Sequence, residues 1–301
     1  MSTRSRWQQL ATEAVNPRSR HIDKMTASEM VDVMILDNRH VLAAVKREKV
    51  RIARAGEMIG EAVRGGGRLI FVGAGTSGRL GVLEAAELPP TFGIAPATAL
   101  ALMAGGPAAV HRAKEGVEDD YRDGERQLSR LRTGRKDVVI GISASGITPF
   151  VRGALTRARK ARASIIGITC DSRSALKEMA DVAIVLAVGP EVIAGSTRLK
   201  AGTATKVVLN MLTTTAMVRA GKTYGNLMVD VKSNSEKLRD RARRIIGAVT
   251  NLGYDEAGDL LDRAGWNVKA AILMQETGVT RPRALSLLRV EPRLRKVLGR
   301  G

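Results

Sequence analysis

The sequence has one cysteine, three histidines and few aromatic residues, which make up 3% of its 301 residues. A single cysteine excludes a disulfide within the chain and a cysteine-based zinc cluster, and the histidines lie far apart, so no metal-ligand spacing is present. The scarcity of aromatic rings leaves few platforms on which nucleic-acid bases could stack. We therefore expect no bound metal.

The sequence also lacks a long hydrophobic run. Residues 1–20 carry charged and polar side chains throughout, and no later stretch is apolar over the length that a bilayer requires. We expect neither a signal peptide nor a membrane partner, and we predict a cytoplasmic protein.

Acidic residues are fewer than basic ones: 30 Asp and Glu stand against 49 Lys and Arg, a formal net charge of +19. Such an excess attracts anions, which include both sugar phosphates and nucleic acids. The basic residues are spread over segments with helical spacing, such as 46–51 and 237–244. We interpret them as solvated helix surface and expect no nucleic-acid partner.

Short apolar runs alternate with longer amphipathic stretches between residues 68 and 188. The runs predict strands at residues 69–73, 98–103, 137–142, 164–169 and 182–187. With helices between them, this alternation is typical of an α/β fold with a doubly wound, mainly parallel sheet. Cys170 follows the fourth run, where a buried structural thiol is expected.

Helical segments flank the predicted sheet on both sides. Residues 27–63 predict two helices, interrupted near Asp37 and Asn38. The C-terminal region predicts three short helices, at residues 255–263, 267–276 and 281–288. We therefore expect three parts, an N-terminal helical segment, a central ligand-binding domain and a small C-terminal helical module, with bounds at 1–64, 65–233 and 234–301.

A glycine-rich loop follows the first predicted strand. Residues 73–78 read Gly-Ala-Gly-Thr-Ser-Gly and precede a helix expected to begin near Ser77. The spacing fits a dinucleotide fingerprint, but no Asp or Glu ends the next strand to hold a ribose, and no Gly-Lys-Ser/Thr ending marks a nucleotide P-loop. We expect no cofactor. Hydroxyls at a helix N-terminus suit a phosphate monoester.

Similar chemistry recurs further along the chain. Residues 143–149, Ser-Ala-Ser-Gly-Ile-Thr-Pro, follow the strand at 137–142, and a long helix is expected from Ser196 to Arg219. In an open α/β sheet, ligands bind outside the carboxyl ends of the strands, so these turns can converge on one phosphate. The candidate phosphosugar-binding residues are Thr76, Ser77, Gly78, Ser143, Ser145, Thr148, Ser196, Thr197 and Lys200.

Longer strings of the sequence are typical of one family. Residues 73–81, 87–93, 104–106, 115–119, 195–204 and 225–231 resemble, in this order, strings of the N-acetylmuramic acid 6-phosphate etherases, phosphosugar-binding proteins with a sugar isomerase (SIS) domain. The resemblance extends from 12–17 to 234–238. It implies the SIS fold, a homodimer, and cleavage of the D-lactyl ether of N-acetylmuramic acid 6-phosphate to N-acetylglucosamine 6-phosphate and D-lactate in peptidoglycan recycling.

The implied reaction is an elimination followed by a hydration, because opening the sugar to its aldehyde makes the C2 proton acidic and lets lactate leave from C3. It needs an acid and a base. By the family's pattern, Glu87, before Pro89 near a helix end, is the proton donor, and Glu118 is the second acid/base residue. Glu84 and Glu115 each lie about one turn earlier and are interpreted as supporting or surface residues.

Two alternatives share the predicted phosphate site. SIS domains also occur in regulators such as the glucokinase regulatory protein, so a non-catalytic phosphosugar sensor is one; an aldose–ketose isomerase with Glu191 as its base is the other. The etherase is favoured because both glutamates are present and the resemblance extends into the C-terminal helices. Those helices resemble part of a ubiquitin-associated domain.

Overall fold

The computed structural model describes residues 10–231 and 233–299, and the chain forms two compact units. The first comprises residues up to Ala85 together with 97–214, and the second comprises 86–96 together with residues from Thr215 onwards. Helices α3 (Gly75–Phe92) and α8 (Lys200–Arg219) each begin in the first unit and end in the second. This division differs from the three expected parts, because the N-terminal helices belong to the same unit as the sheet.

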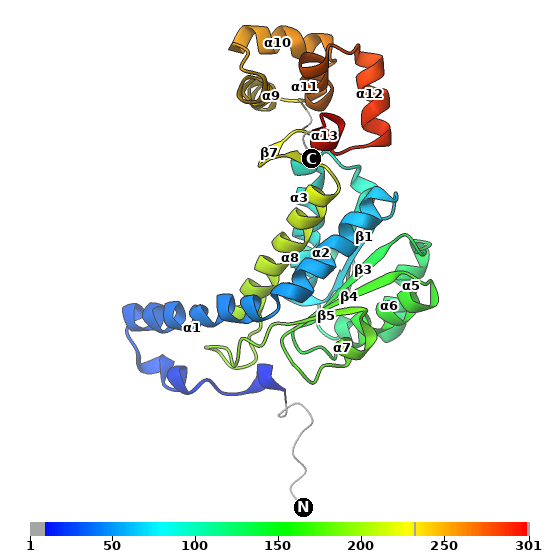
Figure 1. Cartoon of the computed structure of the whole chain (residues 1–301). Coiled ribbons are helices and arrows are strands. Elements are labelled where there is room, and N and C mark those ends of the chain that lie inside the picture. Colours follow the sequence, from blue (N-terminus) through cyan, green and yellow to red (C-terminus); the bar gives the residue numbers. More distant parts are fainter. Residues whose placement is uncertain (1–9, 232, 300–301) are drawn as a thin grey trace, which may run out of the picture. The chain divides into compact units, whose positions relative to one another are not determined.

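The first unit is built around a five-stranded parallel sheet (Figure 1). Its strands are β1 (Leu69–Gly73), β2 (Ala99–Met103), β3 (Val138–Ile142), β4 (Ser164–Thr169) and β5 (Val182–Val185). They lie in the order β2-β1-β3-β4-β5, with Leu69 opposite both Ala99 and Val138. The prediction of a doubly wound parallel sheet is confirmed, and the strand bounds agree to within two residues.

Helices cover both faces of this sheet. Besides α3 and α8, the helices of this unit are α1 (Ala27–Arg47), α2 (Lys49–Arg64), α4 (Ala108–His111), α5 (Tyr121–Arg130), α6 (Pro149–Lys160) and α7 (Ala175–Met179). Helices α6 and α7 contact the sheet from one side and α2 from the other (Figure 1). Every residue of β1 and β3 is buried, as is typical of strands covered on both faces. Within residues 10–231 and 233–299, each helix is too short or too polar to cross a bilayer.

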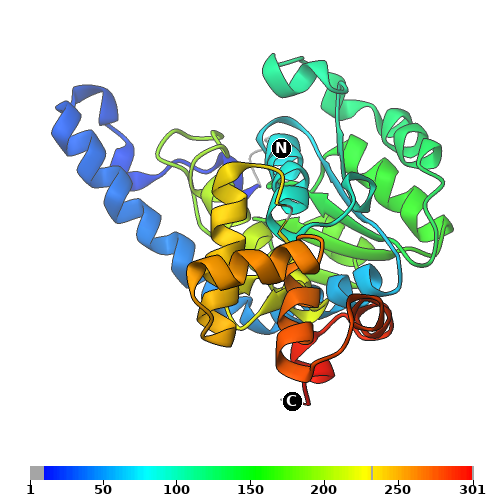
Figure 2. The same cartoon turned by 90° about the horizontal axis from the view of Figure 1, so that it is seen from above.

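The break between α1 and α2 lies at Glu48 and not near Asp37 and Asn38, so that expectation was wrong. Asp37 is buried and its carboxylate lies 2.7 Å from the Lys200 ammonium, while Asn38 Nδ2 donates to Met34 O along the helix. Both polar side chains are therefore compatible with an unbroken helix. Figure 2 shows α1 extending away from the sheet.

The second unit is mainly helical. It contains the two-stranded sheet β6 (Thr223–Tyr224) and β7 (Leu227–Met228), followed by α9 (Glu236–Thr250), α10 (Tyr254–Arg263), α11 (Val268–Thr277), α12 (Arg281–Val290) and α13 (Leu294–Val297). The three C-terminal helices predicted from the sequence correspond to α10, α11 and α12. Val229, Ile246, Leu261 and Ile272 belong to a separate buried core.

Candidate functional site

A cavity of about 460 Å³ lies at the carboxyl ends of β1 and β3. In the sheet, β2 lies on one side of β1 and β3 lies on the other. The direction in which successive strands are added therefore reverses between β1 and β3. Ligands of open α/β sheets bind at such a topological switch point. Of the predicted residues, the cavity brings together Thr76, Ser77, Ser143, Ser145, Thr148, Thr197 and Glu118.

The loop after β3 holds its hydroxyl groups in a fixed arrangement. The buried Ser143 Oγ lies 2.7 Å from Thr148 Oγ1 and 3.4 Å from Ser145 Oγ, and it accepts a hydrogen bond of 3.0 Å from the Gly146 N–H. Gly146 has a φ of +71°, a conformation that favours glycine. The loop therefore presents three hydroxyls to the cavity without a change in its backbone.

Two helix N-termini open into the same cavity. Helix α3 begins at Gly75 and α6 at Pro149, and both residues line the cavity. The first N–H groups of a helix have no partner within it and carry the positive end of the helix dipole. The first N–H groups of α3, together with the hydroxyls of Thr76 and Ser77, provide the donors that an anion requires, whereas Pro149 of α6 has no N–H to donate.

Gly78 has a packing role instead of the expected binding role. Its N–H already donates to Ala74 O at 3.1 Å, so it is not available to a phosphate. A Cβ at this position would lie 2.7 Å from Gly73 O, and Gly78 is not among the residues that line the cavity. The missing side chain lets the first turn of α3 approach the end of β1.

The N-terminus of α8 differs from the expectation. The helix begins at Lys200 and not at Ser196, and the N–H groups of Lys200 and Ala201 donate to the Glu191 carboxylate at 3.0 and 2.8 Å. Glu191 is 1% exposed. A buried carboxylate thus occupies the place where a phosphate was expected, and Glu191 is not placed to act as the base of an isomerase. Thr197 lines the cavity, whereas Ser196 does not.

Lys200 is also directed away from the cavity. Its ammonium lies 2.7 Å from Asp37 Oδ2 and donates to Pro190 O at 2.7 Å, and the side chain is 3% exposed. The ion pair compensates the charge of the buried ammonium. The expectation that Lys200 binds the phosphosugar is not supported by this position.

The cavity contains acidic side chains and no basic ones. Within residues 10–231 and 233–299, no lysine, arginine or histidine lines it, whereas Glu13, Glu118 and Asp119 do. Arg79, from the glycine-rich string, instead donates to Val110 O and Ala109 O. Sequence reasoning missed Glu13 and Asp119 as site residues. The only sequence signal for Glu13 was its place in the family-like string at 12–17.

The two glutamates of α3 have different surroundings. Glu87 is exposed on the part of α3 that belongs to the second unit, and it does not line the cavity. The helix continues through two prolines to Phe92, so Glu87 lies more than one turn before its end. Glu84 is buried and accepts hydrogen bonds from Thr213 Oγ1 at 2.6 Å and Lys206 Nζ at 3.0 Å. Glu84 therefore joins α3 to α8.

Neither a metal centre nor a reactive thiol is evident. In the described part of the chain, no three His, Cys, Asp or Glu side chains are grouped so that they could hold a metal ion. Cys170 is buried, as expected, and burial together with the charges of Glu191 and Asp171 raises the pKa of its thiol to about 12. The thiol is therefore protonated and unreactive at neutral pH.

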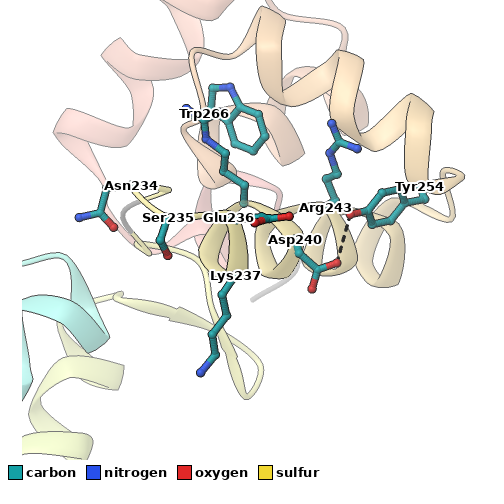
Figure 3. Close-up of a pocket in the computed structure, with 9 residues that line it drawn as sticks. Asn234, Ser235, Glu236, Lys237, Asp240, Arg243, Tyr254 and Trp266 are labelled. Atoms are coloured by element: carbon teal, nitrogen blue, oxygen red, sulfur yellow. Dashed lines mark hydrogen bonds between the residues drawn. The ribbon is translucent and has the colours of Figure 1, made fainter.

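A larger hollow, of about 810 Å³, lies in the second unit (Figure 3). Several of the groups that line it contact one another: Arg239 lies over the Trp266 ring, Arg243 lies over the Tyr254 ring, and Tyr254 OH donates to Asp240 at 3.1 Å. No strand of the parallel sheet ends at this hollow. We therefore favour the cavity at β1 and β3 as the functional site.

Comparisons with known proteins show the fold and the family of this chain. Residues 51–159 match the family model described as the glucokinase regulatory protein N-terminal SIS domain, and this region includes both loops after β1 and β3. The structure of a phosphoheptose isomerase from Francisella tularensis matches with a TM-score of 0.50 and 17% identity, covering 64% of this chain and 100% of that one. This likeness shows the SIS fold.

Curated relatives match over nearly the whole chain. The N-acetylmuramic acid 6-phosphate etherase of Lactobacillus johnsonii is 48% identical over 280 residues, which cover 93% of this chain and 94% of the relative. That of Gloeobacter violaceus is 50% identical over 265 residues, covering 88% and 87%. The chain belongs to the N-acetylmuramic acid 6-phosphate etherase family. The family expected from the sequence strings is thereby confirmed.

Proposed function

We propose that this chain cleaves the D-lactyl ether of N-acetylmuramic acid 6-phosphate and releases N-acetylglucosamine 6-phosphate and D-lactate. The observation that carries the proposal is the sequence identity to named etherases. About half of the residues are identical over about nine-tenths of the chain. Etherases that act on this bond are carbon–oxygen lyases, and the chain is an enzyme of that class. The volume and donors of the cavity are compatible with a phosphosugar.

The phosphate is bound by neutral donors. The hydroxyls of Thr76, Ser77 and Ser145 and the first N–H groups of α3 face the cavity, and none of the side chains that line it within residues 10–231 and 233–299 is basic. A dianion held in this way is stabilised by oriented dipoles. The excess positive charge of the chain is thus not required for binding at this site.

The chemistry is an elimination followed by a hydration. With the sugar in its open aldehyde form, a base removes the C2 proton, the C2–C3 double bond forms, and lactate leaves from C3 with the ether oxygen. Water then adds to C3 and a proton returns to C2. Glu118, which lines the cavity, is the second acid/base residue. Glu87 does not line the cavity, and its role as the proton donor is proposed from the family's pattern alone.

The purified protein is expected to release D-lactate from N-acetylmuramic acid 6-phosphate, measured with a coupled D-lactate dehydrogenase assay. The match of residues 51–159 to a domain of a regulatory protein favours one alternative, a phosphosugar sensor without catalysis. Tight phosphosugar binding without lactate release would establish the sensor and contradict the etherase.

We also propose that the enzyme is a homodimer. Val31, Ile35 and Leu42 of α1 are 50%, 58% and 67% exposed, and their spacing places them on one face of the helix. Such a face is stabilised when a second copy covers it. Light scattering is expected to give about twice the chain mass of 32.2 kDa, and Ile35→Glu to give a monomer. A monomeric mass for the unaltered protein at micromolar concentration would refute the dimer.

A further inference from the structure

The N-terminal segment, residues 10–24, is fixed to the first unit by buried hydrogen bonds. Asn16 Nδ2 donates to Asp37 Oδ1 and to Pro190 O, both at 3.2 Å, and Ser19 Oγ donates to Val192 O at 2.7 Å. Asn16, Ser19 and Asp37 are all buried. Buried hydrogen bonds of this kind are costly to break, so the segment has a defined course over the loop before α8.

The same segment is held at the rim of the cavity. The Gly195 N–H donates to Thr12 O at 3.1 Å, and the Ala11 N–H donates to Asp171 Oδ2 at 3.2 Å. Gly195 has a φ of +78°, and a Cβ there would lie 3.0 Å from Glu13 Oε2. The Glu13 side chain is exposed, and its carboxylate lies next to Gly195 in the cavity wall.

The Glu13 carboxylate has acceptor capacity that the protein does not use. In the described part of the chain, its one hydrogen bond is a long contact of 3.5 Å from Thr12 Oγ1. An ionised carboxylate offers about four acceptor positions. Glu84 is a useful contrast, because Thr213 and Lys206 occupy its oxygens. An exposed carboxylate at the wall of a cavity, with most of its acceptor positions unused by the described residues, is able to accept hydrogen bonds from a ligand.

The charges of a phosphosugar indicate which of its groups the Glu13 carboxylate contacts. A carboxylate repels a phosphate dianion, so Glu13 does not belong to the phosphate-binding part of the cavity, which consists of hydroxyls and N–H groups. Sugar hydroxyls are hydrogen-bond donors. We propose that Glu13 accepts hydrogen bonds from the hydroxyl groups of the bound phosphosugar and positions it for the reaction. This proposal rests on phosphosugar binding at the cavity and is independent of catalysis.

The test compares two ligands by isothermal titration calorimetry. Glu13→Ala is expected to weaken binding of N-acetylglucosamine 6-phosphate by about tenfold or more and to leave binding of inorganic phosphate within about twofold. Glu13→Gln, which keeps one acceptor oxygen, is expected to recover part of the loss. Asp23→Ala is the matched control, because Asp23 is an exposed carboxyl of the same segment that does not line the cavity.

Two results would overturn the role of Glu13. Unchanged affinity of Glu13→Ala for the phosphosugar would mean that the carboxylate makes no bond to it. Equal losses for phosphosugar and inorganic phosphate would mean that Glu13 only maintains the shape of the cavity. Because both ligands are measured without turnover, absence of lactate release from the unaltered protein would count against the etherase proposal and not against this one.

Discussion

Glu118→Gln and Glu87→Gln are each expected to lower the turnover number by about 10²–10⁴-fold, the range that positioned acid and base groups typically contribute. A glutamine has nearly the shape of glutamate but neither accepts nor donates a proton in this reaction. Binding of N-acetylglucosamine 6-phosphate is expected to stay nearly unchanged, because the phosphate contacts are made by other groups. Steady-state lactate release and calorimetry measure the two effects separately.

Glu115→Gln is the control for this pair, since Glu115 is exposed near Glu118 and does not line the cavity. Its turnover number is expected to match that of the unaltered enzyme. If Glu118→Gln also kept full turnover, Glu118 would have no acid/base role. A loss of affinity as large as the loss of turnover would point to binding in place of proton transfer.

Gly146→Ala is expected to reduce phosphosugar affinity by about 100-fold and to destabilise the fold by roughly 1–3 kcal/mol. Its φ of +71° is unfavourable for alanine, and the added Cβ would lie 1.7 Å from Ser174 Oγ and 2.7 Å from Thr169 Oγ1. Ser174 cannot move freely, because its Oγ donates to Gly146 O and caps α7. The loop after β3 must shift, and the Ser143 hydroxyl then loses its contacts with Ser145, Thr148 and the Gly146 N–H.

Gly134→Ala is the matched control for that substitution. An added Cβ at Gly134 meets nothing within 4 Å, and its φ is not positive. Thermal unfolding and calorimetry of both variants distinguish a general effect of replacing a glycine by alanine from the specific disruption of the loop after β3 in Gly146→Ala. Normal phosphosugar affinity in Gly146→Ala would mean that the loop after β3 does not bind the phosphate.

The sheet and the two hydroxyl-rich loops after β1 and β3 were predictable because their signals are local. Each strand is a short apolar run, and the hydroxyls of 74–77 and 143–149 follow β1 and β3 directly in the sequence. Parallel strands bring such loops to one edge of the sheet. The edge of the sheet at which these loops lie was therefore predictable from the sequence, whereas the order of the strands came from the structure.

The start of α8 and the role of Lys200 were not predictable in this way. The cap of α8 is Glu191, nine residues before Lys200 and outside any local capping pattern. The partner of the Lys200 ammonium is Asp37, on a helix far earlier in the sequence. The pairing of two buried charges becomes visible only when the tertiary structure brings them together.

Glu13 was missed for a related reason. It lies in a three-residue helical turn, Ala11–Glu13, with no periodicity around it. Its place at the cavity depends on the bond from Gly195 to Thr12 O and on the anchoring of Asn16, both of which join distant parts of the sequence. Glu84 differs from Glu13, because the sequence already marked it as a supporting or surface residue. In the structure Glu84 is buried and hydrogen-bonded to Thr213 of α8.

The most direct test of the proposed reaction is to carry it out in water labelled with ¹⁸O, and separately in deuterated water, and to analyse both products by mass spectrometry. Elimination followed by hydration places one labelled oxygen at C3 of N-acetylglucosamine 6-phosphate, exchanges the hydrogen at C2 with solvent, and leaves the lactate hydroxyl unlabelled. Labelled oxygen in the lactate hydroxyl, with none at C3 of the sugar, would show that water attacks the lactyl carbon and would contradict the mechanism.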